Sequence, residues 1–79
     1  MGKMSEQEKM DFIAEALDVD VSGLSVETEL ESLEEWDSVA VISFIAMMDD
    51  ELGVSVKGDA VRANKTVGDL VEFIGNYEG

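Results

Sequence analysis

The 79-residue sequence contains no cysteine, histidine or proline, and its 5 basic residues are outnumbered by 19 acidic ones. Without Cys or His there is no thiolate nucleophile, no imidazole base and no soft ligand for structural zinc, which argues against an enzyme. The absence of Cys also excludes a disulfide framework. A formal net charge of -14 repels phosphate backbones, so a nucleic-acid partner is disfavoured and a basic protein surface is expected instead.

Long hydrophobic runs are also missing. No apolar segment approaches the roughly 18 residues that a membrane helix requires, and the first ten residues lack the apolar core of a signal peptide. A content of 46% hydrophobic and 30% charged residues is typical of a globular protein rather than of a disordered acidic tail. We therefore expect a cytoplasmic, monomeric protein with no membrane span, forming a single domain over residues 1–79.

The negative charge is concentrated in one part of the chain. Between Lys9 and Lys57 there are thirteen acidic residues and no basic one. They are Asp11, Glu15, Asp18, Asp20, Glu27, Glu29, Glu31, Glu34, Glu35, Asp37, Asp49, Asp50 and Glu51. The six acids and five bases outside this stretch nearly cancel, so almost the whole electrostatic field comes from the base-free stretch.

Helical patterns bound the base-free stretch on both sides. Ser5 and Glu8 have the spacing of a capping box and predict a helix of about 12 residues. Thr66 and Asp69 have the same spacing and predict a last helix. The apolar residues expected to face the core are Met10, Ile13, Ala14 and Leu17 in the first helix and Val67, Leu70, Val71 and Ile74 in the last.

A third helical pattern runs from about residue 38 to residue 52. Its apolar positions are Val41, Ile45, Met48 and Leu52, widened by Val39, Ile42, Phe44 and Ala46. So few polar positions predict a central helix, which Gly53 is expected to end. One weak helical turn is expected over residues 59–62.

The segment from Asp18 to Asp37 has no clear period. A connection of this length in a small domain needs its own apolar anchors. Those expected are Leu24, Val26, Leu30 and Leu33. The prediction is an all-α fold, a small four-helix bundle with a long loop between its first two helices and a short third helix.

The start of the central helix carries the clearest chemical signal. Asp37 is expected to cap the helix with its carboxylate, while Trp36 and Val41 have the spacing of a hydrophobic staple. Ser38 would then be the first helical residue, with a hydroxyl that capping does not need and that faces solvent. A phosphate attached there would lie near the positive end of the helix macrodipole.

These motifs resemble the acyl carrier protein family over almost the whole chain. The resemblance rests on Asp37-Ser38-Val39 at a helix start, on the acidic helix end followed by Gly53, and on the Thr-Val-Gly-Asp helix from Thr66. It implies that Ser38 is esterified with 4′-phosphopantetheine, which a holo-synthase (a phosphopantetheinyl transferase) takes from coenzyme A with magnesium. The thiol of that arm would carry acyl groups as thioesters, and the four-helix fold with a short third helix is expected.

The resemblance also implies partner enzymes that load and process acyl groups in fatty-acid, polyketide or related specialised biosynthesis. These enzymes are expected to present basic patches to Asp37 and to four further docking residues. The docking residues are Glu34, Glu35, Val39 and Ile42. Val39 stands where the family more often has Leu, and Ala40 and Ser43 stand where fatty-acid carriers often have acids. The acidity of this chain lies instead in the loop before Ser38.

Two further interpretations remain open at this point. One is a small acidic helical adaptor that binds a basic partner without a prosthetic group. The other is a calcium-binding module, suggested by Asp49, Asp50 and Glu51 together with the acidic loop. An EF-hand requires regularly spaced oxygen ligands around a central glycine, and this sequence lacks that pattern, so any divalent binding is expected to be weak charge screening.

Overall fold

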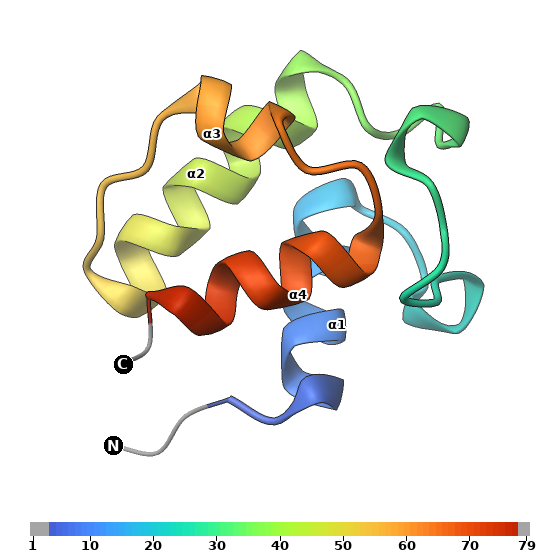
Figure 1. Cartoon of the computed structure of the whole chain (residues 1–79), viewed down its shortest axis with the longest axis horizontal. Coiled ribbons are helices and arrows are strands. Elements are labelled where there is room, and N and C mark those ends of the chain that lie inside the picture. Colours follow the sequence, from blue (N-terminus) through green and yellow to red (C-terminus); the bar gives the residue numbers. More distant parts are fainter. Residues whose placement is uncertain (1–3, 78–79) are drawn as a thin grey trace.

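A computed structural model describes residues 4–77 of the chain. It contains the helices α1 (Glu6–Leu17), α2 (Ser38–Leu52), α3 (Gly58–Arg62) and α4 (Val67–Asn76), with the 3₁₀ turns η1 (Val21–Gly23) and η2 (Leu30–Ser32) between α1 and α2. The predicted four-helix bundle with a long first loop and a short third helix is confirmed (Figure 1). Across residues 4–77, no helix is both long and apolar enough to traverse a bilayer.

Both predicted capping boxes are present. The Ser5 hydroxyl accepts a hydrogen bond from the Glu8 amide at 3.1 Å, and the Ser5 amide donates to the Glu8 carboxylate at 2.8 Å. In α4 the Thr66 hydroxyl accepts from the Asp69 amide at 3.1 Å. The Asp69 carboxylate in turn accepts from the backbone amides of Lys65 and Thr66, and these bonds hold the pKa of that carboxyl below its ordinary value.

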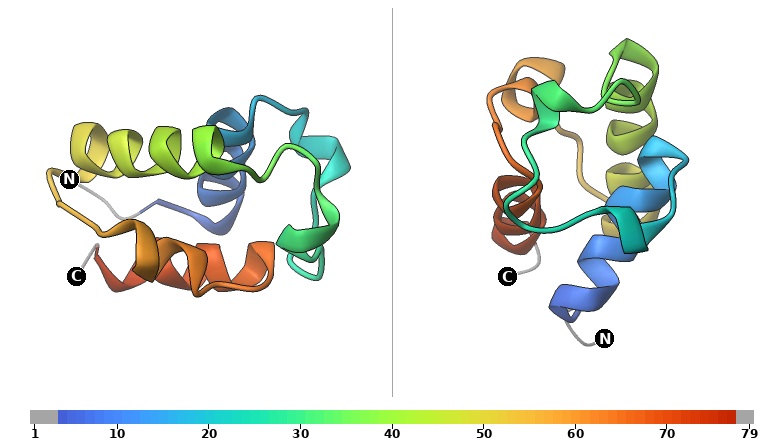
Figure 2. Two further views of the ribbon diagram at one scale, coloured as in Figure 1. Left: turned by 90° about the horizontal axis from the view of Figure 1, so that it is seen from above. Right: turned by 90° about the vertical axis from the view of Figure 1, so that its right-hand side faces the viewer.

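Aromatic side chains from three helices meet in the core. The ring centroid of Phe44 in α2 lies 5.7 Å from that of Phe12 in α1, with the two rings edge to face. It lies 6.1 Å from the ring centroid of Phe73 in α4. Phe44 is fully buried. Burying such a side chain stabilises the fold by about 1.5–3 kcal/mol. Figure 2 shows α2 on one side of the molecule and α3 and α4 on the other, so the aromatic cluster joins the two sides.

Only one face of α2 is buried. Its buried residues are Ala40, Val41, Phe44 and Met48. Val39 is 69% exposed, Ile42 is 64% exposed, and Ala46 is also exposed. The prediction that these three widen the buried stripe is therefore wrong. They recur at i, i+3 and i+7, which forms a second apolar stripe on the side that neither α1 nor α3 covers.

Backbone hydrogen bonds fasten the long loop to the start of α4. The Leu30 amide donates to the Lys65 carbonyl at 2.8 Å, and the Val67 amide donates to the Thr28 carbonyl at 2.9 Å. The Leu30 side chain is 1% exposed and anchors the loop in the core as predicted. The loop therefore satisfies N–H groups that a helix start otherwise leaves without partners.

Val26 anchors the same loop by its backbone and not by its side chain. Its side chain is 41% exposed, so the prediction of an apolar anchor is wrong at this position. Its carbonyl instead accepts a hydrogen bond from the Gly68 amide at 2.9 Å. A Cβ at Gly68 would lie 2.9 Å from that carbonyl oxygen, so only glycine allows this approach. The other predicted anchors, Leu24 and Leu33, are partly buried and pack against the core.

Candidate functional site

Asp37 caps α2 as predicted. It has an extended backbone, and its carboxylate accepts a hydrogen bond from the Ala40 amide at 3.0 Å. Its carbonyl accepts the Val41 amide at 3.0 Å, which is the first regular bond of the helix. Asp37 therefore fixes where α2 begins, and the next residue in the chain becomes the first helical one.

That residue, Ser38, is exposed to solvent. Its hydroxyl makes no hydrogen bond to any of residues 4–77, and the backbone amides of Ser38 and Val39 also have no partner in that range. This start of α2 differs from that of α4, whose first two amides are occupied by loop carbonyls. An anion at Ser38 would therefore meet free N–H groups and the positive end of the macrodipole, which stabilises it by about 0.3–1 kcal/mol.

A short turn before Asp37 sets the direction in which the chain enters α2. The Trp36 amide donates to the Leu33 carbonyl at 3.1 Å, and the Asp37 amide donates to the Glu35 carbonyl at 3.0 Å. The Trp36 side chain is partly buried and packs against the core. Its pairing with Val41 in a hydrophobic staple stays a prediction. Trp36 therefore holds the helix start against the bundle.

An acidic hollow of about 550 Å³ lies beside Ser38, between the end of α1 and the start of α2. Its lining residues are Glu15, Ala16, Leu17, Asp18, Glu35, Asp37, Val39, Ala40 and Ser43. Nothing in the sequence places Glu15 and Asp18 near Ser38, since they are about twenty residues upstream. The one sequence feature that links these two acids to Ser38 is that all three lie in the base-free stretch. The packing of α1 against α2 brings the two acids to the acidic hollow.

Only some of the predicted docking residues lie around the acidic hollow. Glu35, Asp37 and Val39 line the acidic hollow, whereas Glu34 and Ile42 do not. Glu34 is exposed in the turn before Trp36, and Ile42 is exposed one helical turn after Ser38. The surroundings of Ser38 therefore combine carboxylates with exposed apolar side chains.

The acidic side chains do not form a metal site in the described part of the chain. Within residues 4–77, no three of them are grouped so that they could hold a metal ion. The geometry therefore gives the calcium interpretation no support.

Two comparisons with known proteins identify the class to which this fold belongs. The family model for the phosphopantetheine attachment site matches residues 10–74, which is most of the chain. The helical bundle with an exposed serine at a helix start is thus a phosphopantetheine-binding domain.

A second comparison gives the family. The chain is similar to the acyl carrier protein of Lactobacillus acidophilus, with 32% identity over 80 residues that cover 96% of this chain and 100% of the relative. This chain therefore belongs to the acyl carrier protein family, whose members are carriers rather than catalysts and hold a covalently attached 4′-phosphopantetheine. The resemblance noted from the motifs is confirmed at the level of the family.

Proposed function

We propose that Ser38 is the residue that holds 4′-phosphopantetheine, through a phosphoester bond to its hydroxyl oxygen, and that residues 1–79 act as a single carrier domain. When bound, the group supplies a thiol that carries acyl groups as thioesters. The chain has no cysteine of its own to do so. The acyl groups would belong to fatty-acid, polyketide or related specialised biosynthesis.

The observation that carries this proposal is the free, exposed hydroxyl of Ser38 in the first turn of α2. Because that hydroxyl has no hydrogen-bond partner within residues 4–77, modification breaks no contact. The free amides of Ser38 and Val39 offset part of the repulsion between a phosphate and the nearby carboxylates. Asp37 contributes by capping α2, which keeps the hydroxyl at the helix start.

We further propose that the surroundings of Ser38 form the docking surface for partner enzymes. Glu34, Glu35 and Asp37 would pair with basic patches on the transferase and on enzymes that load and process acyl groups. Val39 and Ile42, both more than 60% exposed, would add apolar contact. Charge of this kind mainly raises the rate of encounter, so docking should weaken as salt is added.

The test is modification of the purified chain with coenzyme A, magnesium and a phosphopantetheinyl transferase of broad specificity. Intact mass spectrometry should show the addition of one phosphopantetheine group. Ser38→Ala should abolish the addition, whereas Ser43→Ala, a matched change in the same helix, should leave it intact. A lack of addition to the unchanged protein, or addition that survives Ser38→Ala, would contradict the proposal.

A further inference from the structure

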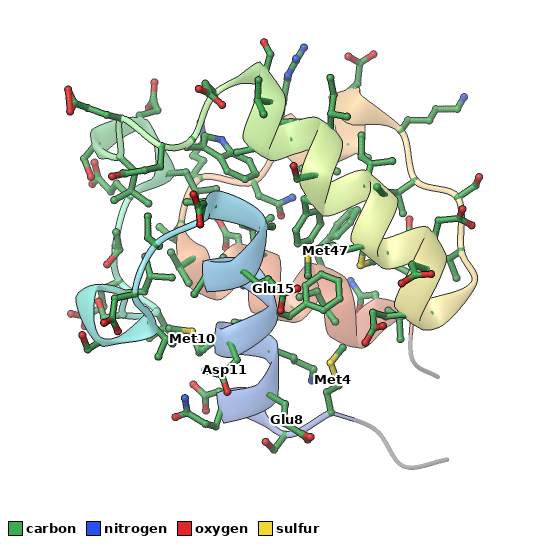
Figure 3. All side chains as sticks on the ribbon, turned by 180° about the vertical axis from the view of Figure 1, so that it is seen from behind. Met4, Glu8, Met10, Asp11, Glu15 and Met47 are labelled. Carbon is green, nitrogen blue, oxygen red and sulfur yellow. The ribbon has the colours of Figure 1, made fainter. Side chains whose placement is uncertain are left out.

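A second hollow, of about 320 Å³, lies between α1 and the last turns of α2. We call it the methionine hollow. It is lined by Met4, Phe12 and Met47, together with Glu8, Asp11, Glu15, Asp50 and Glu51. Figure 3, seen from behind, shows Glu8, Asp11 and Glu15 along α1, Met4 just before the start of that helix, and Met47 of α2 near Glu15.

The acids of this hollow come from one side of α1 and from the end of α2. Glu8, Asp11 and Glu15 follow each other at i, i+3 and i+7 and therefore share one side of α1. Asp50 and Glu51 lie in the last turn of α2, at the negative end of its macrodipole, and that turn holds no basic residue. Acids are disfavoured at a helix C-terminus, so the charge here opposes local helix stability.

Within residues 4–77, no basic residue lines the methionine hollow. The nearest basic residue along α1 is Lys9, and its side chain reaches toward α4. A Cβ built on Gly75 of α4 would lie 3.4 Å from the Lys9 Nζ atom. Five carboxylates around one hollow are therefore a complementary surface for positive charge on another molecule.

The floor of the hollow is apolar and deformable. Met4 and Met47 are partly buried and pack against the core, and Phe12, which also lines the hollow, is 6% exposed. Methionine is unbranched and polarisable, so a methionine floor can adapt to an apolar side chain that enters it. An apolar floor with a charged rim is the surface that an amphipathic helix recognises.

We propose that the methionine hollow docks a basic amphipathic helix of a partner protein. One apolar side chain of that helix would rest on Met4 and Met47, and its Lys or Arg residues would pair with the surrounding carboxylates. Asp50 follows Ser38 by twelve residues, which is about 18 Å along a helix. Glu15 also lines the acidic hollow, but a partner at the Asp50 end of the methionine hollow leaves Ser38 accessible. The proposal does not depend on modification of Ser38.

The probe for the test is a synthetic helical peptide of Leu and Lys. It is titrated into the full chain labelled with ¹³C at the methionine methyl groups. The signals of Met4 and Met47 should shift, whereas that of Met48, which is fully buried, should not. A peptide in which every Lys is replaced by Glu serves as the control and should cause no shift.

Two triple variants distinguish binding at the methionine hollow from attraction to the net charge of the protein. The triple variant Asp11→Asn/Asp50→Asn/Glu51→Gln should weaken peptide binding about tenfold at low salt. The control removes the same number of charges from the loop, as Glu27→Gln/Glu29→Gln/Glu31→Gln, and should weaken binding less than about twofold. Met47→Gln preserves the charge and should weaken binding about threefold by making the floor polar.

Several results would overturn the proposal. Equal losses in the two triple variants would mean that the peptide senses only net charge. Shifts absent from Met4 and Met47, or reproduced by Mg²⁺ alone, would mean that this hollow does not select a basic helix. Ser38→Ala should bind the peptide with unchanged affinity, so this test and the modification test can fail separately.

Discussion

Replacing Gly68 by alanine should destabilise the protein, although alanine is the better helix former. A Cβ at this position would lie 2.9 Å from the Val26 carbonyl oxygen and 3.2 Å from the Val26 Cβ. Both atoms belong to or adjoin the loop backbone, so the loop must move away from α4. That movement weakens the 2.9 Å hydrogen bond from the Gly68 amide to the Val26 carbonyl.

The magnitude follows from three contributions. Loss of the hydrogen bond costs about 0.5–1.5 kcal/mol, and the steric conflict costs about 1–3 kcal/mol. The higher helix propensity of alanine offsets about 0.5–1 kcal/mol of this loss in stability. The net loss is about 2 kcal/mol, which lowers the unfolding temperature by about 8–16 °C. A domain of this size has about 4–12 kcal/mol of stability in total, so the variant should still fold.

The assay is thermal and urea unfolding followed by circular dichroism, and Gly75→Ala in the same helix is the matched control. A Cβ at Gly75 would meet only the flexible end of the Lys9 side chain at 3.4 Å. That variant should be as stable as the unchanged protein or more stable by up to about 1 kcal/mol. If Gly68→Ala is as stable as Gly75→Ala, the close approach of the loop to α4 does not govern this region.

Three further predictions concern single side chains. Asp37→Ala should lower the free energy of unfolding by about 0.5–2 kcal/mol because α2 loses its cap, whereas Asp37→Asn should lose less; urea unfolding of both variants measures the difference. The Asp69 carboxyl has a lowered folded-state pKa, so its contribution to stability is fully present above the ordinary pKa of 3.8 and is lost as the pH falls through the folded-state value. The gap in unfolding free energy between the unchanged protein and Asp69→Asn should therefore shrink in acid, and a gap that widens there would contradict this reasoning. Glu35→Gln should slow modification by the transferase about threefold at low salt, and added salt should remove the difference; Glu31→Gln, which is outside the acidic hollow, is the control, and equal slowing in both would count against local docking.

The helix ends predicted from the sequence are confirmed by the structure. The capping residues Ser5, Asp37 and Thr66 begin their helices as predicted, and Gly53 ends α2 with a left-handed backbone at φ 68°. Capping depends on residues three or four positions apart, so the sequence contains the whole interaction. The role of Ser38 as the attachment residue remains a prediction that its free hydroxyl supports.

The choice between the two apolar stripes of α2 could not be made from the sequence. Both the stripe with Phe44 and the stripe with Val39 and Ile42 have helical spacing, and hydrophobicity alone does not rank them. Contacts with α1 and α3 decide which stripe is buried, and these contacts join distant parts of the chain. The exposed stripe is therefore available to partner enzymes.

Short-range patterns and their order along the chain were enough to predict the helices, their ends, the exposed serine at the start of α2 and the family. Which charges share a surface became known only from the fold. It placed Glu15 and Asp18 beside the Ser38 helix start and gathered five carboxylates around Met4 and Met47. Electrostatic and packing energies depend on distances in space and not on separation along the chain. Because a long loop joins α1 to α2, the packing of core side chains, and not the connection, sets how the two helices lie against each other.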